Sequence, residues 1–221
     1  AAKEEWMTVP NYLTKGSVER RFLYRMINPR TFTNLTYSCG MDYNLSNNIM
    51  GRLLDEYVEG ILAQRSSRRY MMCHGVKSSL LNYPEQIFAM GVEFETDSAN
   101  ADVVKGIVGG AIEAVAAGAV QESGLAALKQ QLKDDFLAAN ATNRYWLDVF
   151  EHRYMMGKDF FSNYMQSLDA ITPGQLKDFA SRLLNEGNMV AITMEGTTKD
   201  VSTENLFKEN EFIKEYFDIS W

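Results

Sequence analysis

The residues best able to ligate a metal lie between Asp148 and His152, in the run DVFEH. An inverted zinc motif reads His-x-x-Glu-His, in which the histidines bind zinc and the glutamate is the general base. Here the Glu-His pair is in place and an aspartate, which can also ligate zinc, stands at the first histidine position. One interpretation is therefore a degenerate zinc site. The other is a surface Glu and His on a helix whose opposite face carries Trp146, Val149 and Phe150.

The chain has only two histidines and two cysteines, and one of each is adjacent at Cys73-His74. Neighbouring residues of a strand point to opposite faces, so this pair can hardly hold one ion, and His74 is expected to be structural or exposed. Cys39 and Cys73 could form one disulfide, but their strand-like contexts fit buried small hydrophobes as well. No Gly-rich phosphate loop, Gly-x-Ser-x-Gly elbow or oriented Cys/His pair supports a self-sufficient enzyme with another site.

Composition narrows the class of protein. The 221 residues carry a net charge of -7, which argues against a nucleic-acid partner, and the basic cluster of Arg65, Arg68 and Arg69 is too short to form a phosphate-binding stripe. No apolar run approaches the length of a membrane span. We expect residues 1–15 to be a linker or truncation remnant, residues 16–196 to form one domain, and residues 197–221 to form a tail.

Hydrophobic periodicity predicts strands that alternate with long helices. Alternating residues indicate strands at 18–26 and 33–39, and a hairpin of strands at 70–81 and 86–95. Helices are expected at 44–64, at 98–118, where Gly106, Gly109 and Gly110 permit close backbone approach, and from Leu125, continuing as far as Gly157. Thr172-Pro173-Gly174-Gln175 is typical of a helix start, and a short strand follows at 189–194. This order, with hairpin-like strand pairs, predicts an α+β fold in which long helices cover one side of a mostly antiparallel sheet.

The order of these segments resembles the pitrilysin/insulinase family of zinc metallopeptidases, over residues 16–196. SSLLNYPEQIFAMGVEFETD is similar to the family's hairpin, NRYWLDVF to its Trp-containing helix, and ITPGQLKDFASRLLNEGNMVAITMEG to its closing helix and strand. The resemblance is to the C-terminal half of such an enzyme. It implies a half-domain of the mitochondrial-processing-peptidase-like fold, in which tandem halves enclose a chamber and the N-terminal half carries the zinc on His-x-x-Glu-His. This chain lacks that motif, so we expect neither a catalytic residue nor a metal ligand in it, and zinc in the partner half.

The resemblance also implies substrate-binding residues. In the family, an arginine after the first long helix and a tyrosine seven positions later reach toward the substrate. These positions fall on Arg65 and Met72, so the tyrosine is replaced. Tyr70, on the same face of a regular strand, could substitute, or the tyrosine function is absent. Arg65 could equally be a solvated cation at a helix end, with Arg68 and Arg69 as alternative anchors.

The expected function is therefore that of a non-catalytic half. It would close a peptide-degrading chamber and contact an unstructured peptide held by a zinc-bearing half, in the same chain or in a paired subunit. The alternative is a catalytically inactive family member that acts as a structural or peptide-binding subunit. Relatives suggest a periplasmic or exported bacterial protein. Aromatic residues of the tail, such as Phe207, Phe212 and Phe217, are expected to pack on this domain, on the missing half or on another chain.

Overall fold

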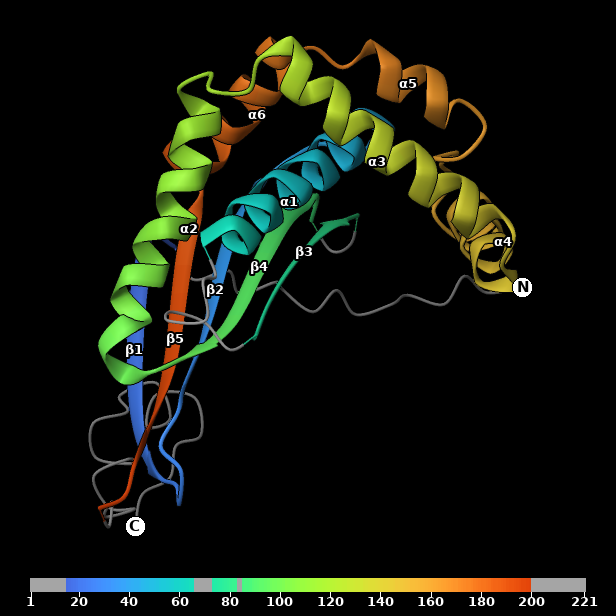
Figure 1. Ribbon diagram of the computed structural model, residues 1–221. Helices are drawn as coiled ribbons and strands as arrows, with labels where there is room; N and C mark the ends of the chain where they lie inside the picture. The colour runs from blue at the N-terminus through green and yellow to red at the C-terminus, as the bar shows by residue number, and fades with distance from the viewer. Residues whose placement is uncertain (1–14, 66–72, 83–84, 200–221) are drawn as a thin grey trace.

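Five strands form a mixed sheet in the order β1-β5-β2-β4-β3, and helices cover one of its faces (Figure 1). The computed structural model describes residues 15–65, 73–82 and 85–199. β1 runs parallel to β5, and the other neighbouring pairs are antiparallel. The predicted α+β fold with a mostly antiparallel sheet is thereby confirmed. The strands are β1 (Ser17–Arg25), β2 (Thr31–Gly40), β3 (Cys73–Leu81), β4 (Ile87–Thr96) and β5 (Asn188–Thr197).

The helices pack against the sheet and then extend beyond its β3 edge, where α3 and α4 project outward (Figure 1). On the face of β5 that points away from the helices, Ile192 and Met194 are 41% and 44% exposed, so this face lacks the helical cover that the other face has. The helical elements are α1 (Leu45–Arg65), a short 3-10 turn (Ser98–Asn100), α2 (Ala101–Ala116), α3 (Glu122–Asn140), α4 (Asn143–Phe150), a π-helical turn (Glu151–Met155), α5 (Tyr164–Ala170) and α6 (Pro173–Asn185).

The first two strands do not form a hairpin, which corrects the expected hairpin-like pairing. The last strand, β5, lies between them and pairs with β1 from Ser17↔Met189 to Arg25↔Thr197. On its other side it pairs with β2, where Leu35 lies beside Ala191. Ala191 and Thr193 are buried, so β5 contributes helix-facing residues to the interior of the domain. Strands 3 and 4 do form the predicted antiparallel hairpin.

The helix expected to run from Leu125 to Gly157 is broken in two. Thr142 adopts an extended backbone, and its hydroxyl accepts the Tyr145 N–H, so α4 begins with its own N-cap. A threonine that bonds the local backbone in this way competes with a continuous helix. After Phe150 the helix widens into the π-helical turn. The predicted start of α6, in contrast, is confirmed: Thr172 and Gln175 form a capping box, and Pro173 is the first helical residue.

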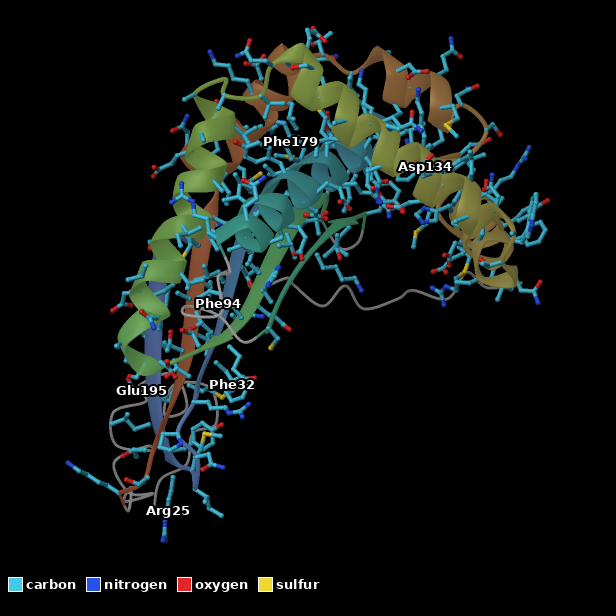
Figure 2. All side chains as sticks on the ribbon, in the orientation of Figure 1. Arg25, Phe32, Phe94, Asp134, Phe179 and Glu195 are labelled. Atoms are coloured by element: carbon cyan, nitrogen blue, oxygen red, sulfur yellow. The ribbon has the colours of Figure 1, made fainter. Side chains whose placement is uncertain are left out.

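The core lies between the sheet and the helices α1, α2 and α6. The rings of Phe88 of β4 and Phe179 of α6 meet edge to face in this layer, with their centroids 4.9 Å apart. Figure 2 labels Phe179. Close backbone approach occurs at Gly51 of α1, where an added Cβ would lie 2.4 Å from Phe88 Cε2. The glycines of α2 do not have this role, because a Cβ at Gly106 or Gly110 would meet nothing within 4 Å and one at Gly109 would make only an ordinary contact, 3.7 Å from Tyr37 Oη. α1 therefore rests on β4 at the site of one glycine.

Candidate functional site

Two adjoining cavities lie along the outer edge of β3, and we call them together the edge groove. The smaller, about 350 Å³, lies between α1 and β3, and the larger, about 570 Å³, continues under α3 and α4. Residues of α3 and α4, the two helices that project past β3 in Figure 1, line the outer side of the larger cavity. Four residues line both cavities and join them: Asn48 and Arg52 of α1, and Lys77 and Ser78 of β3.

Asp55 of α1 is the residue of the edge groove with the most perturbed chemistry. Its Oδ2 accepts the Ser78 N–H at 2.9 Å and the Ser78 hydroxyl at 2.6 Å. Its Oδ1 is buried and meets no hydrogen-bond partner among the described residues. Burial raises the pKa of Asp55 to about 6, against the lowering effect of the two Ser78 hydrogen bonds and Arg52. A half-buried carboxyl group with a perturbed pKa in a cleft is a candidate functional residue.

Acidic groups outnumber basic ones along the edge groove. Arg144 pairs with Asp148 at 2.9 Å, one turn apart on α4. Burial, and then the charge of Asp135, raise the pKa of Glu56. The groove therefore presents an excess of negative charge. Its acidic lining residues are Asp55, Glu56, Asp135, Asp148 and Glu151, and its basic ones are Arg52, Lys77 and Arg144.

Aromatic side chains form the far wall of the larger cavity. Phe136 of α3 stacks on Tyr164 of α5 with ring centroids 4.2 Å apart. Tyr145 of α4 meets both Phe136 and Phe161 edge to face. These contacts hold α3, α4 and the segment before α5 together, so the wall is a packed aromatic cluster. The edge groove is thus lined by both aromatic and acidic side chains.

The run from Asp148 to His152 does not assemble as a metal site. Asp148 pairs with Arg144, and His152 Nδ1 lies 2.7 Å from Tyr43 Oη. Burial, and then the charge of Glu151, raise the pKa of Tyr43, so its hydroxyl stays protonated and can donate to His152. In the part of the chain that the structure describes, no three His, Cys, Asp or Glu residues lie together as a candidate metal-binding group.

The alternative interpretation of this run, a surface Glu and His on a helix whose opposite face carries Trp146, Val149 and Phe150, holds for Glu151, which is exposed, but not for His152. His152 is half-buried and stacks on the Tyr43 ring, with 8° between the ring planes. Trp146 and Phe150 are each 53% exposed. The reason is long-range, because Tyr43 and Phe160 supply the aromatic pocket that takes the imidazole.

Cys73 and His74 point to opposite faces of β3, as expected. His74 Nε2 lies 2.9 Å from Glu59 Oε1 of α1, so this histidine is structural. Cys73 is exposed and donates to Glu95 Oε2 at 3.6 Å. Cys39 is buried, and both thiols are free, since β4 separates their strands. Only Cys39 behaves as the expected buried hydrophobe.

The substrate-binding residues expected from the sequence lie away from this groove or outside the described residues. Arg65 is the last residue of α1 and is exposed, and it is not among the residues that line the edge groove. Tyr70 and Met72, like Arg68 and Arg69, lie outside the described residues. The role expected of Arg65, Tyr70 and Met72 therefore stays a prediction.

Sequence reasoning did not single out Asp55, although a signal was present. Asp55 falls on the line of Gly51, Val58 and Leu62, which are buried on one face of α1. A carboxylate on the buried face of a helix needs a partner or a function. The groove itself could not be found from sequence, because its wall comes from α3 and α4, far along the chain.

No family model and no curated protein sequence matches this chain. Solved structures do share its fold. A conserved protein from Enterococcus faecalis V583 is 14% identical with a TM-score of 0.68, over 90% of this chain and 46% of that one. The periplasmic protease PqqL from Escherichia coli is 10% identical with a TM-score of 0.68, over 83% of this chain and 21% of that one. A peptidase M16 inactive domain from Pseudomonas fluorescens is 16% identical with a TM-score of 0.60, over 84% of this chain and 44% of that one.

The likeness to the M16 domain, and to a predicted insulinase family protease from Yersinia pestis (14% identical, TM-score 0.58, over 89% of this chain and 46% of that one), shows that the fold is that of M16, or insulinase-like, peptidase domains, which confirms the resemblance seen in the sequence. The chain spans half or less of each of these proteins. None of the described helices is both long enough and apolar enough to cross a membrane.

Proposed function

We propose that this chain is the non-catalytic C-terminal half of a zinc metalloendopeptidase, which closes a peptide-degrading chamber against a zinc-bearing half and contacts the substrate there. The observation that carries the proposal is the extent of the fold similarity. This chain matches about half of the E. faecalis protein and less than half of a domain described as inactive. A protein that is one half of a longer peptidase accounts for both facts.

The chemistry of the chain agrees with a non-catalytic role. Its two histidines are His74, which pairs with Glu59, and His152, which bonds Tyr43. Both imidazoles thus have protein partners, which supports a chain that contributes neither zinc ligands nor the general base. Zinc and the general base would therefore come from the partner half, in the same chain or in a paired subunit. The periplasm is the proposed compartment, by analogy with PqqL.

A second candidate function is that of a catalytically inactive subunit which binds peptides or supports an assembly. The description of the P. fluorescens domain as inactive favours this candidate. The two functions differ in whether the longer parent protein cleaves peptides.

The deciding experiment compares the parent protein with this 221-residue chain in a peptidase assay. The substrate is a quenched, unstructured peptide, with and without a chelator, and bound zinc is measured in both proteins. The half-enzyme function predicts chelator-sensitive cleavage by the parent and none by this chain. Absence of cleavage by both would favour the inactive subunit. Stoichiometric zinc and cleavage in this chain alone would overturn both candidates.

A further inference from the structure

The sheet has an apolar face that points away from the helices, and we call it the open face. The strand register places Phe22 of β1, Met194 of β5 and Phe32 of β2 side by side in one row on it. Thr33 and Thr193, which alternate with these residues, are buried on the helix side. In the part of the chain that the structure describes, no helix covers this row (Figure 1). An uncovered apolar surface of this kind is normally a place of contact with another segment or protein.

The open face is hollowed between β5 and β3. The hollow measures about 410 Å³, and its lining includes Phe32, Asn34, Cys73, Glu93, Ile192 and Met194. Figure 2 labels Phe32. Cys73 lies in the same row as Phe32, because both pair with Glu95 of β4. Cys73 is exposed, whereas Cys39 is buried. The hollow therefore has room for bulky apolar side chains and carries the more accessible of the two thiols.

Positive charge gathers beside the open face. Arg20 of β1 lies in the row of Ile192. Arg30 pairs with Glu95 at 2.5 Å. Residues 15–30, which include β1 and the turn after it, carry five cations and a single carboxylate, whereas the chain as a whole is acidic. A segment that packs here should therefore combine apolar side chains with negative charge.

The tail has both properties. Residues 200–221 contain six carboxylates and two lysines. At the spacing of a helix, an apolar stripe forms from Leu206, Phe212, Ile213, Tyr216 and Phe217. These residues lie outside the described ranges, so the stripe is an inference from their sequence alone.

The tail also leaves the sheet at a suitable place. β5 ends at Thr197, beside Arg25 of β1. A helix over residues 206–217 would be about 18 Å long, and the rows from Val190 to Met194 of β5 span roughly 13 Å. A connection as short as residues 198–205 holds the tail near its own sheet at an effective concentration on the order of millimolar. Its own open face is therefore favoured over that of a second copy.

We propose that residues 206–217 pack as an amphipathic helix on the open face of their own chain, with the apolar stripe over Phe32, Ile192 and Met194 and in the hollow beside Cys73. Of the three places that the sequence leaves open for the tail, the proposal selects this domain over the missing half and another chain. It goes beyond the proposed function, since it needs neither a zinc-bearing half nor a peptide substrate.

The reaction of Cys73 with an aromatic disulfide reagent tests the proposal in the full 221-residue chain. Ile213→Asp puts a charge in the apolar stripe, and Lys214→Asp puts the same residue one position later, outside the stripe. Because a charge is disfavoured on an apolar surface, Cys73 should react about fivefold or more faster in Ile213→Asp than in wild type. In Lys214→Asp the rate should stay within about twofold of wild type. Equal rates in all three proteins would overturn the proposal.

A peptide of residues 200–221 provides a second measurement. Added at about millimolar concentration to the Ile213→Asp chain, it should slow the reaction of Cys73 toward the wild-type rate. The same peptide with the Ile213→Asp change should leave the rate unchanged. If both peptides slowed the reaction alike, the cover would be non-specific and the proposal would be overturned.

Sedimentation and dilution decide whose tail is bound. Packing on the same chain predicts a monomer, and a wild-type rate that stays constant when the protein is diluted about a hundredfold. A dimer whose Cys73 becomes more reactive on dilution would place the tail on a second copy and overturn the proposal. Protection that appears only after a zinc-bearing half is added would overturn it as well. Because no step involves peptide cleavage, failure here leaves the proposed half-enzyme unaffected, and failure of the cleavage assay leaves this inference unaffected.

Discussion

Tyr43 Oη and His152 Nδ1 lie 2.7 Å apart, with their rings parallel to within 8°. Tyr43 lies just before α1, and His152 lies in the π-helical turn after α4. Phe160 packs against both rings, at 4.8 Å from Tyr43 and 5.1 Å from His152. This contact ties the turn after α4 to the segment between β2 and α1, and so helps to hold the outer wall of the edge groove in place.

Replacing Tyr43 by Phe should destabilise the protein by about 1 kcal/mol, because the ring contacts remain and one partly buried hydrogen bond is lost. Urea unfolding measures the difference. Tyr154→Phe is the control, since Tyr154 lies in the same turn but is 77% exposed, and it should change stability by less than about 0.5 kcal/mol. Equal effects of the two substitutions would mean that the Tyr43 hydrogen bond contributes nothing.

Asp55 should make stability depend on pH in an unusual direction. Its pKa is raised from 3.8 to about 6 in the folded protein, so between these values the folded chain holds a proton that the unfolded chain releases. The contribution of Asp55 to stability is therefore greatest below about pH 4 and is lost as pH rises through 6, by up to about 3 kcal/mol. Urea unfolding from pH 4 to 7.5 should show wild type losing stability relative to Asp55→Asn over this window. The free energy of unfolding of Asp134→Asn, a change at an exposed site, should vary with pH as that of wild type does. If the curve for Asp55→Asn also ran parallel to that of wild type, the raised pKa would be contradicted.

Gly51→Ala should destabilise the protein by about 1–3 kcal/mol, because its Cβ would lie 2.4 Å from the buried ring of Phe88. Gly60→Ala in the same helix is the control. A Cβ there meets nothing within 4 Å, so the change should stabilise by about 0.5–1 kcal/mol through helix propensity. Opposite signs in thermal or urea unfolding are the expected result. A neutral Gly51→Ala would show that α1 can shift away from β4 at little cost.

Arg65→Gln should lower kcat/KM of the parent peptidase about tenfold if this arginine contacts the substrate, without changing the stability of this chain. Arg182→Gln is the matched control, because Arg182 also lies in the last turn of an exposed helix end. Its effect on peptide cleavage should be negligible. If both variants retain full activity, Arg65 is a solvated helix-end cation, as the alternative interpretation holds.

Local sequence rules were sufficient where neighbours decide the structure. Thr172, Pro173 and Gln175 specify the start of α6 within four residues, and the structure contains the capping box that they predict. The same kind of rule was available at Thr142 but was outweighed by the long apolar periodicity around it. The helix break there was therefore missed, although its cause is equally local.

Features that depend on distant partners could not be predicted. The inward turn of His152 depends on Tyr43, 109 residues earlier, and the place of β5 depends on pairing with β1 and β2, which both lie far earlier in the chain. The candidate site is of this second kind. The sequence shows Asp55 as a carboxylate on the buried face of a helix. That it accepts the Ser78 N–H could not be predicted, because this contact depends on how α1 packs against β3.

The insertion of β5 beside β1 also has a consequence for how the chain folds. The Gly16 N–H donates to Asn188 Oδ1 across 172 residues, and the parallel ladder begins at the next residue. A contact this distant closes a very long loop and is formed at a high entropic cost, which slows folding. During synthesis, the first strand must wait for nearly the whole domain before its partner emerges from the ribosome. The hairpin of β3 and β4, and the helices that lie between β2 and β5 in the chain, can form before β5 is available. We therefore expect the pairing of β1 with β5 to be the last part of the sheet to form.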